Sequence, residues 1–245
     1  MALGTSSAFR SILPLFFLFF FFASPAVKAE EPGAPPESAS PSSASAAERA
    51  FAAAREIGDL VRRVESYYAG LGSFRVAVER SVTSPIFGDD QSQSGTIHVV
   101  GRRLRWEYDA PEGQVAGFDG RRWWFVVPEE EQVKTHEPVA GEINPLGLIT
   151  GELDLLEVFA VQFSDSPPEN GGDAVLELYF REPQELYDFA ILEVDSSSGV
   201  IHRLEVIDSL GDRDVYRFGI PVRQKPLPPE MFRLVRPQGY EVVDY

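Results

Sequence analysis

Hydrophobic residues recur at three- and four-residue steps over one long stretch of the chain, from Glu48 to Leu71. The positions that fall on one stripe of a helix are Phe51, Ala54, Ile57, Val61, Val64, Tyr68 and Leu71. Gly70 and Gly72 stand where the stripe ends, which is typical of a helix C-terminus. The spacing predicts one long amphipathic helix, whose apolar stripe must lie against another apolar layer.

From Phe74 onward the apolar positions alternate with polar ones, as in β-strands that have one covered face. The clearest case is 103–108, where the apolar residues are Leu104, Trp106 and Tyr108. Asp119-Gly120 predicts a hairpin turn. The following stretch, 122–127, is apolar at almost every position, so both of its faces must be covered. Further strand patterns lie at 74–79, 96–100, 114–118, 132–136, 159–163, 174–180, 189–194, 200–207, 215–220 and from Phe232.

The alternation breaks between Asn144 and Glu157, where the pattern predicts two short helices separated by Gly151. In total we expect about ten or eleven strands joined mostly by short turns. Such a chain is mainly β, pairs antiparallel and curls into a barrel or sandwich. The long helix and the two short ones could cover one mouth of the curled sheet.

The N-terminal region carries two segments that do not belong to this fold. Residues 1–29 combine Arg10, an apolar run from Ile12 to Ala23 and small residues at Val27 and Ala29, which predicts a secretory signal peptide. The run is shorter than the roughly 20 residues that cross a bilayer. Residues 30–47 are rich in Pro, Ala and Ser and predict a disordered leader. A single domain is expected over 48–245.

The charge and the lack of cysteine narrow the classes of function. The formal charge of −16 falls to −18 when residues 1–29 are removed, because that segment holds two cations and no carboxylate. An acidic chain poor in lysine argues against nucleic-acid binding, which needs cations to displace counterions. The chain has no cysteine, which excludes disulfides and an acylated N-terminal cysteine. We expect a monomer that is free in the periplasm.

The sequence contains few motifs typical of catalytic, metal-binding or phosphate-binding sites. The three histidines, His98, His136 and His202, lie in predicted strands, and none stands in a recognisable Ser-His-Asp order. No spacing typical of zinc or calcium ligands occurs, and no Gly-rich phosphate loop precedes a helix. We therefore expect no catalytic residue, no metal and no cofactor. Paired carboxylates of a secreted hydrolase are an alternative that spacing alone leaves open.

Four segments of the chain stand out by their motifs. The first is GTIHVVGRRLRWEYDAP at 95–111, with its aromatic strand and closing proline. The second is 115–133, which contains Asp119-Gly120, an aromatic strand and Gln132-Val133. The third is 144–163, and the fourth is FRLVRPQGYEV at 232–242. In this order the four segments resemble signatures of the LolA family of periplasmic lipoprotein carriers, and the resemblance covers the chain from about residue 48 to its end.

The resemblance implies an unclosed antiparallel β-barrel covered by about three helices, with an apolar hollow between sheet and lid. In that family the hollow takes the acyl chains of lipoproteins released by an inner-membrane ABC transporter and later passed to an outer-membrane lipoprotein receptor. Candidate lining residues on the aromatic strands are Leu104, Trp106, Tyr108, Phe118, Trp123, Trp124 and Phe125.

The family's lid is tied by an arginine of an Arg-Pro pair on the aromatic strand. Counted back from Trp106 without a gap, that pair falls on Val100 and Gly101. Arg102 or Arg103 could take the role only with a shift of two or three positions, and the arginines of this strand could equally be surface residues or cation–π partners. This divergence leaves open a second cargo, a glycolipid or another amphiphile on the same fold. A sensor of mislocalised lipoproteins is a further alternative.

Overall fold

The structure is a computed structural model, which describes residues 43–244 except 86–90, 140–141, 152 and 185. The predicted signal peptide and most of the predicted leader lie outside these residues. The long helix, α1 (Ser43–Leu71), begins five residues before the predicted start. Residues 43–47 of the predicted leader therefore belong to the helix, because Ala-rich sequence favours helix extension.

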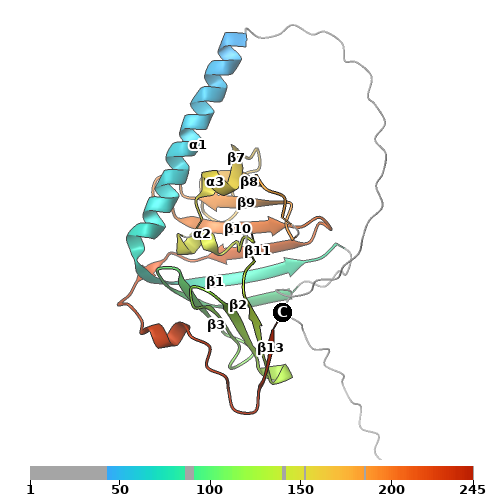
Figure 1. The fold of residues 1–245 in the computed structure, drawn as a ribbon. Helices are drawn as coiled ribbons and strands as arrows, with labels where there is room; N and C mark the ends of the chain where they lie inside the picture. The colour runs from blue at the N-terminus through green and yellow to red at the C-terminus, as the bar shows by residue number, and fades with distance from the viewer. Residues whose placement is uncertain (1–42, 86–90, 140–141, 152, 185, 245) are drawn as a thin grey trace, which may run out of the picture.

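One large sheet dominates the molecule (Figure 1). Its strands are β1 (Ser73–Thr83), β2 (Gln91–Val100), β3 (Arg103–Tyr108), β4 (Val115–Phe118), β5 (Trp123–Val127), β6 (Gln132–His136), β7 (Phe159–Phe163), β8 (Ala174–Phe180), β9 (Phe189–Val194), β10 (Ile201–Ile207), β11 (Arg213–Phe218), β12 (Val222–Arg223) and β13 (Glu241–Asp244). The short helices are α2 (Gly147–Thr150) and α3 (Leu155–Val158), with 3₁₀ turns η1 (Pro128–Glu130) and η2 (Pro229–Phe232).

The strands run in the order β13-β6-β5-β4-β3-β2-β1-β11-β10-β9-β8-β7, and β12 pairs with β1 beside this path. Two antiparallel meanders, β1–β6 and β7–β11, thus join through the pairing of β1 with β11. All pairs are antiparallel except β13 with β6. Among the described strands β7 and β13 stand at opposite ends of the order, so the barrel is unclosed, as predicted.

The strand count and the C-terminus differ from the expectation of ten or eleven strands. In the part of the chain that the structure describes, the sheet has thirteen strands. The pattern missed β12, which is only two residues long, and β13, which carries no strong alternation. The strand expected from Phe232 is wrong: Phe232 closes the 3₁₀ turn η2, and the last strand begins at Glu241. Proline at the start of η2 favours the turn and removes a strand donor.

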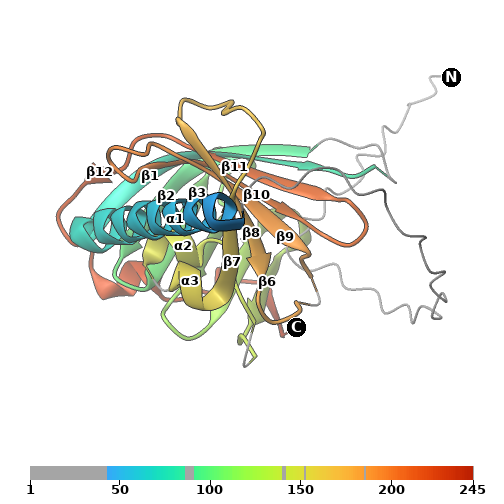
Figure 2. The same cartoon turned by 90° about the horizontal axis from the view of Figure 1, so that it is seen from above.

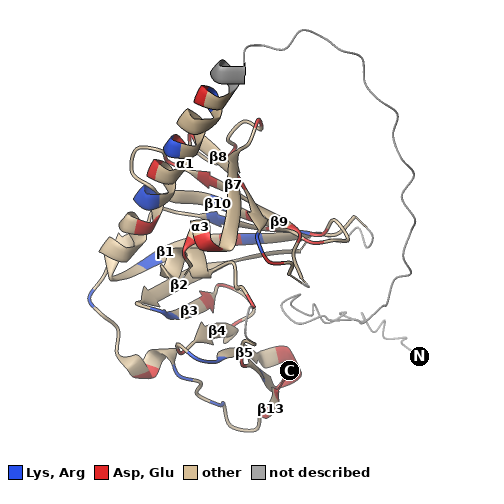
Figure 3. Ribbon diagram, turned by 45° about the horizontal axis from the view of Figure 1, so that its top comes forward, with Lys and Arg blue, Asp and Glu red and all other residues tan. Residues whose placement is uncertain are grey.

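The three helices cover one face of the curved sheet, which we call the inner face (Figure 2). On α1 the buried residues are Leu60, Val61, Val64, Tyr68 and Leu71. The apolar stripe predicted for α1 packs against the sheet only from about Ile57 onward. The first turns of α1 extend past the sheet, so Phe51 is 66% exposed. Charged residues of both signs follow the exposed length of α1 (Figure 3).

A close contact fixes α1 against the turn that joins β9 to β10. Gly199 has a φ of +83°, and a Cβ at this position would lie 2.6 Å from the carbonyl oxygen of Arg63. The Arg63 guanidinium donates to the carbonyl of Ser196, and the Ile201 amide donates to the Tyr68 hydroxyl over 3.2 Å. These contacts hold the C-terminal half of α1 over the sheet.

Candidate functional site

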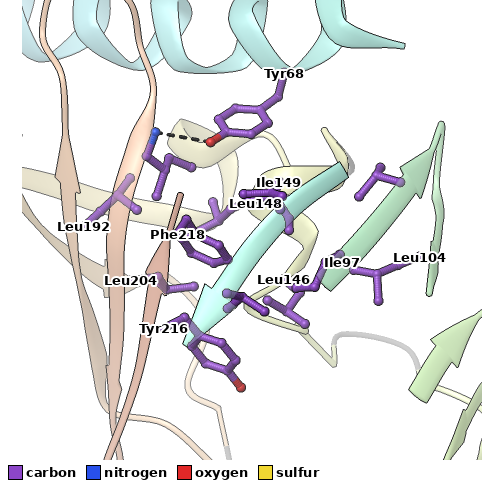
Figure 4. Close-up of a cluster of buried hydrophobic side chains, with 14 of the residues drawn as sticks. Tyr68, Ile97, Leu104, Leu146, Leu148, Ile149, Leu192, Leu204, Tyr216 and Phe218 are labelled. Carbon is purple, nitrogen blue, oxygen red and sulfur yellow. Dashed lines mark hydrogen bonds between the residues drawn. The ribbon is translucent and has the colours of Figure 1, made fainter. Parts of the chain in front are cut away.

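A lid of short helices closes over the inner face. Leu146, Leu148 and Ile149 are between 1% and 6% exposed and share one apolar cluster with the inner-face residues of the sheet. In Figure 4 the three side chains lie among residues of the sheet, including Ile97 and Phe218. The lid therefore fills the inner face with its own side chains in this structure.

Local sequence explains why the lid segment forms two one-turn helices. The Asn144 side chain accepts from the Leu146 amide over 2.8 Å, and Gly151 ends α2 with a φ of +70°, which glycine adopts at no steric cost. Asp154 caps α3 by accepting from the amides of Leu156 and Glu157.

The tie between lid and long helix comes from a residue that sequence reasoning missed. The Leu155 amide, at the start of α3, donates to Glu65 Oε1 of α1 over 3.0 Å. A carboxylate at the first turn of a helix is stabilised by unpaired amides. Nothing in the sequence pattern links Glu65 to a segment 90 residues away, so only the fold reveals this contact.

Six of the seven predicted lining residues lie on the inner face: Leu104, Trp106, Tyr108, Phe118, Trp123 and Phe125. Ring stacking joins two pairs of them, with centroid distances of 4.4 Å for Trp106–Tyr108 and 4.8 Å for Phe118–Trp123. The alternation of β3 and β5 accounts for this grouping, because alternate residues of a strand share a face.

Trp124 is the exception and lies on the opposite, outer face. It forms a separate cluster with Val126 and Val133, covered by Leu234 and Tyr240 of the C-terminal segment. Its indole Nε1 donates to the carbonyl of Phe232 over 3.0 Å. Trp124 thus anchors the C-terminal segment, and its assignment to the lining of the hollow is corrected.

The structure places the two predicted lid-tying arginines, Arg102 and Arg103, in different surroundings. Arg103 lies on the outer face, with its guanidinium carbon 5.8 Å from the centre of the Phe232 ring. Arg105 follows on the same face, over Trp124, and donates to the Met231 carbonyl over 3.0 Å. Arg102 lies exposed in the turn between β2 and β3. The structure therefore corrects the role expected of Arg103, and a role for Arg102 at the lid stays a prediction.

A small pocket lies between the lid and β4–β5. It has a volume of about 100 Å³ and is lined by Phe118, Trp123, Pro138, Glu142, Asn144, Leu146, Gly147, Thr150 and Leu153. Ligand pockets usually enclose about 300–1,000 Å³. This pocket is too small for an acyl chain, so a chain can enter here only if the lid moves.

The inner face also carries a buried ion pair. The Arg80 side chain is 3% exposed and donates from Nε and Nη2 to the two oxygens of Asp214, each over 2.8 Å. Tyr216 donates its hydroxyl to Asp214 over 2.8 Å. Burial alone would lower the pKa of Arg80, but Asp214 and its neighbours raise the pKa well above its usual value, so the guanidinium stays charged.

Two of the three histidines, His98 and His136, have ordinary structural partners. His136 Nε2 lies 2.8 Å from both oxygens of Glu142, and His98 lies 3.3 Å from the Gln224 amide nitrogen. Within the described ranges, no group of three or more His, Asp or Glu side chains could hold a metal ion. No helix in the same part of the chain is long and apolar enough to cross a membrane.

Comparison with known proteins gives one consistent family. The family model described as outer membrane lipoprotein carrier protein LolA matches residues 75–235. An outer-membrane lipoprotein carrier protein of Dechloromonas aromatica is 29% identical over 62% of this chain and 72% of its own length. One of Xanthomonas oryzae pv. oryzae is 25% identical over 80% of this chain and 91% of its own.

The solved structures that this chain resembles are more distant in sequence. A LolA superfamily protein from Nitrosomonas europaea is 15% identical with a TM-score of 0.40, over 71% of this chain and 96% of its own. A protein from Thermus thermophilus is 13% identical with a TM-score of 0.45, over 77% of this chain and 99% of its own.

Proposed function

Because the chain belongs to the LolA family of outer membrane lipoprotein carriers, we propose that it carries acylated lipoproteins across the periplasm. The observation that supports this most is the large apolar cluster that the inner face shares with a lid of one-turn helices. We propose that acyl chains replace Leu146, Leu148 and Ile149 against the sheet when the lid opens, and that the cargo leaves chemically unchanged.

The physical need for such a carrier follows from the cost of exposing acyl chains to water. Each methylene that leaves water for an apolar surface gains about 0.8 kcal/mol. A chain of about sixteen carbons therefore stays in a membrane unless another apolar surface takes it. The inner face supplies this surface, and the lid covers it between rounds of transport.

A carrier must also release its cargo, and the lid is suited to this. Helices of one turn have little stability of their own and depend on packing. Among the described contacts, α3 is tied to α1 through the Glu65–Leu155 hydrogen bond, and α2 is held mainly by apolar side chains. We propose that closure of this lid competes with the cargo, so that binding stays reversible.

A carrier of this kind also needs a partner at each membrane. We propose that an inner-membrane lipoprotein-releasing ABC transporter loads the protein and that an outer-membrane lipoprotein receptor unloads it. We further propose that residues 1–29 direct export and are removed, and that the carrier works as a monomer.

A second cargo is favoured by one observation. Arg103, a candidate for the arginine that ties the lid, lies on the outer face, so of the two candidates only Arg102 is left for the latch that the family resemblance implies. A lid with a different latch suits a different amphiphile, such as a glycolipid.

Mass spectrometry of protein purified gently from its native periplasm separates the two cargoes. Bound lipoprotein, with its diacylglyceryl-modified cysteine, is the expected result. A bound glycolipid and no acylated protein would overturn the lipoprotein assignment while preserving the fold's role as a carrier.

A further inference from the structure

Two hydrogen-bond donors are buried in the inner face without a partner. Trp106 Nε1 and Tyr108 Oη are inaccessible to solvent, and no described residue accepts a hydrogen bond from either. The two residues are 1% and 8% exposed. Most buried polar groups in proteins are paired, because an unpaired one loses its hydrogen bonds to water and gains none in return. Two such groups side by side require an explanation.

The two donors belong to one constellation. Trp106 and Tyr108 are two residues apart on the inner face of β3, and their rings stack at 4.4 Å with planes 13° apart. Tyr216 of β11 lies beside them, with its ring centre 6.2 Å from that of Trp106, and Arg80 lies over the Tyr216 ring. Gly95 of β2 faces the indole, where a Cβ would lie 2.8 Å from Nε1.

The charges around the donors favour a neutral acceptor. The Arg80 guanidinium is already balanced by the Asp214 carboxylate, so the constellation has no net positive charge to attract an anion. Burial raises the pKa of Tyr108 far above its usual value, so its hydroxyl keeps its proton. The indole N–H can only donate. An uncharged carbonyl oxygen fits these donors better than a phosphate or a carboxylate, which would add an unbalanced charge to a buried site.

We propose that Trp106 Nε1 and Tyr108 Oη form a binding site for the carbonyl oxygens of the ester-linked acyl chains of the cargo. This inference rests on the proposed carrier function and deepens it. In the empty protein the donors are unpaired, which weakens the closed state. In the loaded protein the carbonyls satisfy them, so the carrier distinguishes an acyl ester from a plain hydrocarbon chain.

The test compares two synthetic lipopeptides that differ only at the linkage, one with two ester-linked acyl chains and one with the same chains linked as ethers. An ether oxygen is a poorer acceptor, and the chain lengths are equal. We expect residues 30–245 to bind the ester about tenfold more tightly than the ether, in keeping with the loss of one or two hydrogen bonds to buried donors.

Tyr108→Phe removes a single hydroxyl and is the most direct variant. Ester affinity should fall at least about threefold while ether affinity stays unchanged, and the empty protein should be equally or more heat-stable because an unpaired donor is gone. Tyr68→Phe is the matched control: its hydroxyl already accepts from the Ile201 amide, so its loss should lower heat stability without changing the ratio of ester to ether affinity.

The outcomes separate this site from the carrier function on which it rests. Equal affinity of the unmodified protein for ester and ether would overturn the donor site and leave the carrier intact. An unchanged ester-to-ether ratio in Tyr108→Phe would remove Tyr108 from the site. Failure of the folded protein to bind either lipopeptide would overturn the proposed function itself.

Discussion

Replacing a lid side chain should strengthen cargo binding while it weakens the fold. Ile149 of α2 is 1% exposed and packs into the apolar cluster between lid and sheet. Truncation of a buried isoleucine to alanine costs about 2–5 kcal/mol. Because Ile149 occupies space that an acyl chain must enter, this loss falls on the closed, empty state and not on the loaded one. If the closed state loses about 3 kcal/mol, the apparent affinity for the acyl cargo rises up to about a hundredfold. Because the lid relaxes around the smaller side chain, we expect a gain in affinity of about tenfold.

The assay titrates Ile149→Ala and the unmodified protein with a fluorescent diacyl lipopeptide and measures stability by urea denaturation. Val133→Ala is the control, since Val133 is fully buried but belongs to the separate outer-face cluster around Trp124. It should lose similar stability without a gain in affinity. If Ile149→Ala instead bound the lipopeptide more weakly, Ile149 would be a cargo contact and the lid would not compete with cargo.

Three further outcomes are expected. Asp214→Asn should cost about 3 kcal/mol in urea denaturation, because it removes the carboxylate that accepts two hydrogen bonds from the buried Arg80 guanidinium; a loss below about 1 kcal/mol would show that solvent screens the pair. Trp124→Ala should cost about 3 kcal/mol without changing lipopeptide affinity, and a fall in affinity would contradict its outer-face position. Hydrogen bonds from Ser197 lower the pKa of Asp195 from 3.8 to about 2. The ionised Asp195 carboxylate therefore contributes fully to the free energy of unfolding above about pH 4, and this contribution is lost as pH falls through 2. We therefore expect the difference in stability between Asp195→Asn and the unmodified protein to shrink as the pH is lowered from 5 to 2. A constant difference would refute the stabilising role of the ionised Asp195 carboxylate.

The alternation of β3 predicts which of its residues share a face, but it does not say which face lines the hollow. Leu104, Trp106 and Tyr108 must share a face, and the arginines between them must share the other. The same parity shows that Arg103 and Trp106 point in opposite directions, which excludes Arg103 from the lid. Strand parity, and not distance along the chain, therefore decides which arginines of this strand can reach the lid.

The stretch 122–127 shows what the sequence pattern alone does not predict. Its pattern correctly indicated that both faces are covered, but it carries no information on which segment covers each face. The cover of Trp124 comes from Phe232 and its neighbours, 108 residues away. The parallel pairing of β13 with β6 was missed for the same reason, because it depends on where a proline-rich segment returns to the sheet.

The most direct test of the carrier function is release of lipoproteins from membranes. Residues 30–245 are incubated with spheroplasts of the native host, and the soluble fraction is examined for lipoproteins bound to the added protein. We expect the unmodified protein to release lipoproteins and Trp106→Asp, which places a charge on the inner face, to release none. Arg102→Ala tests whether Arg102, the remaining lid-tying candidate, affects this release. If the folded protein, with an active transporter present, leaves all lipoproteins in the membrane, lipoprotein carriage is refuted.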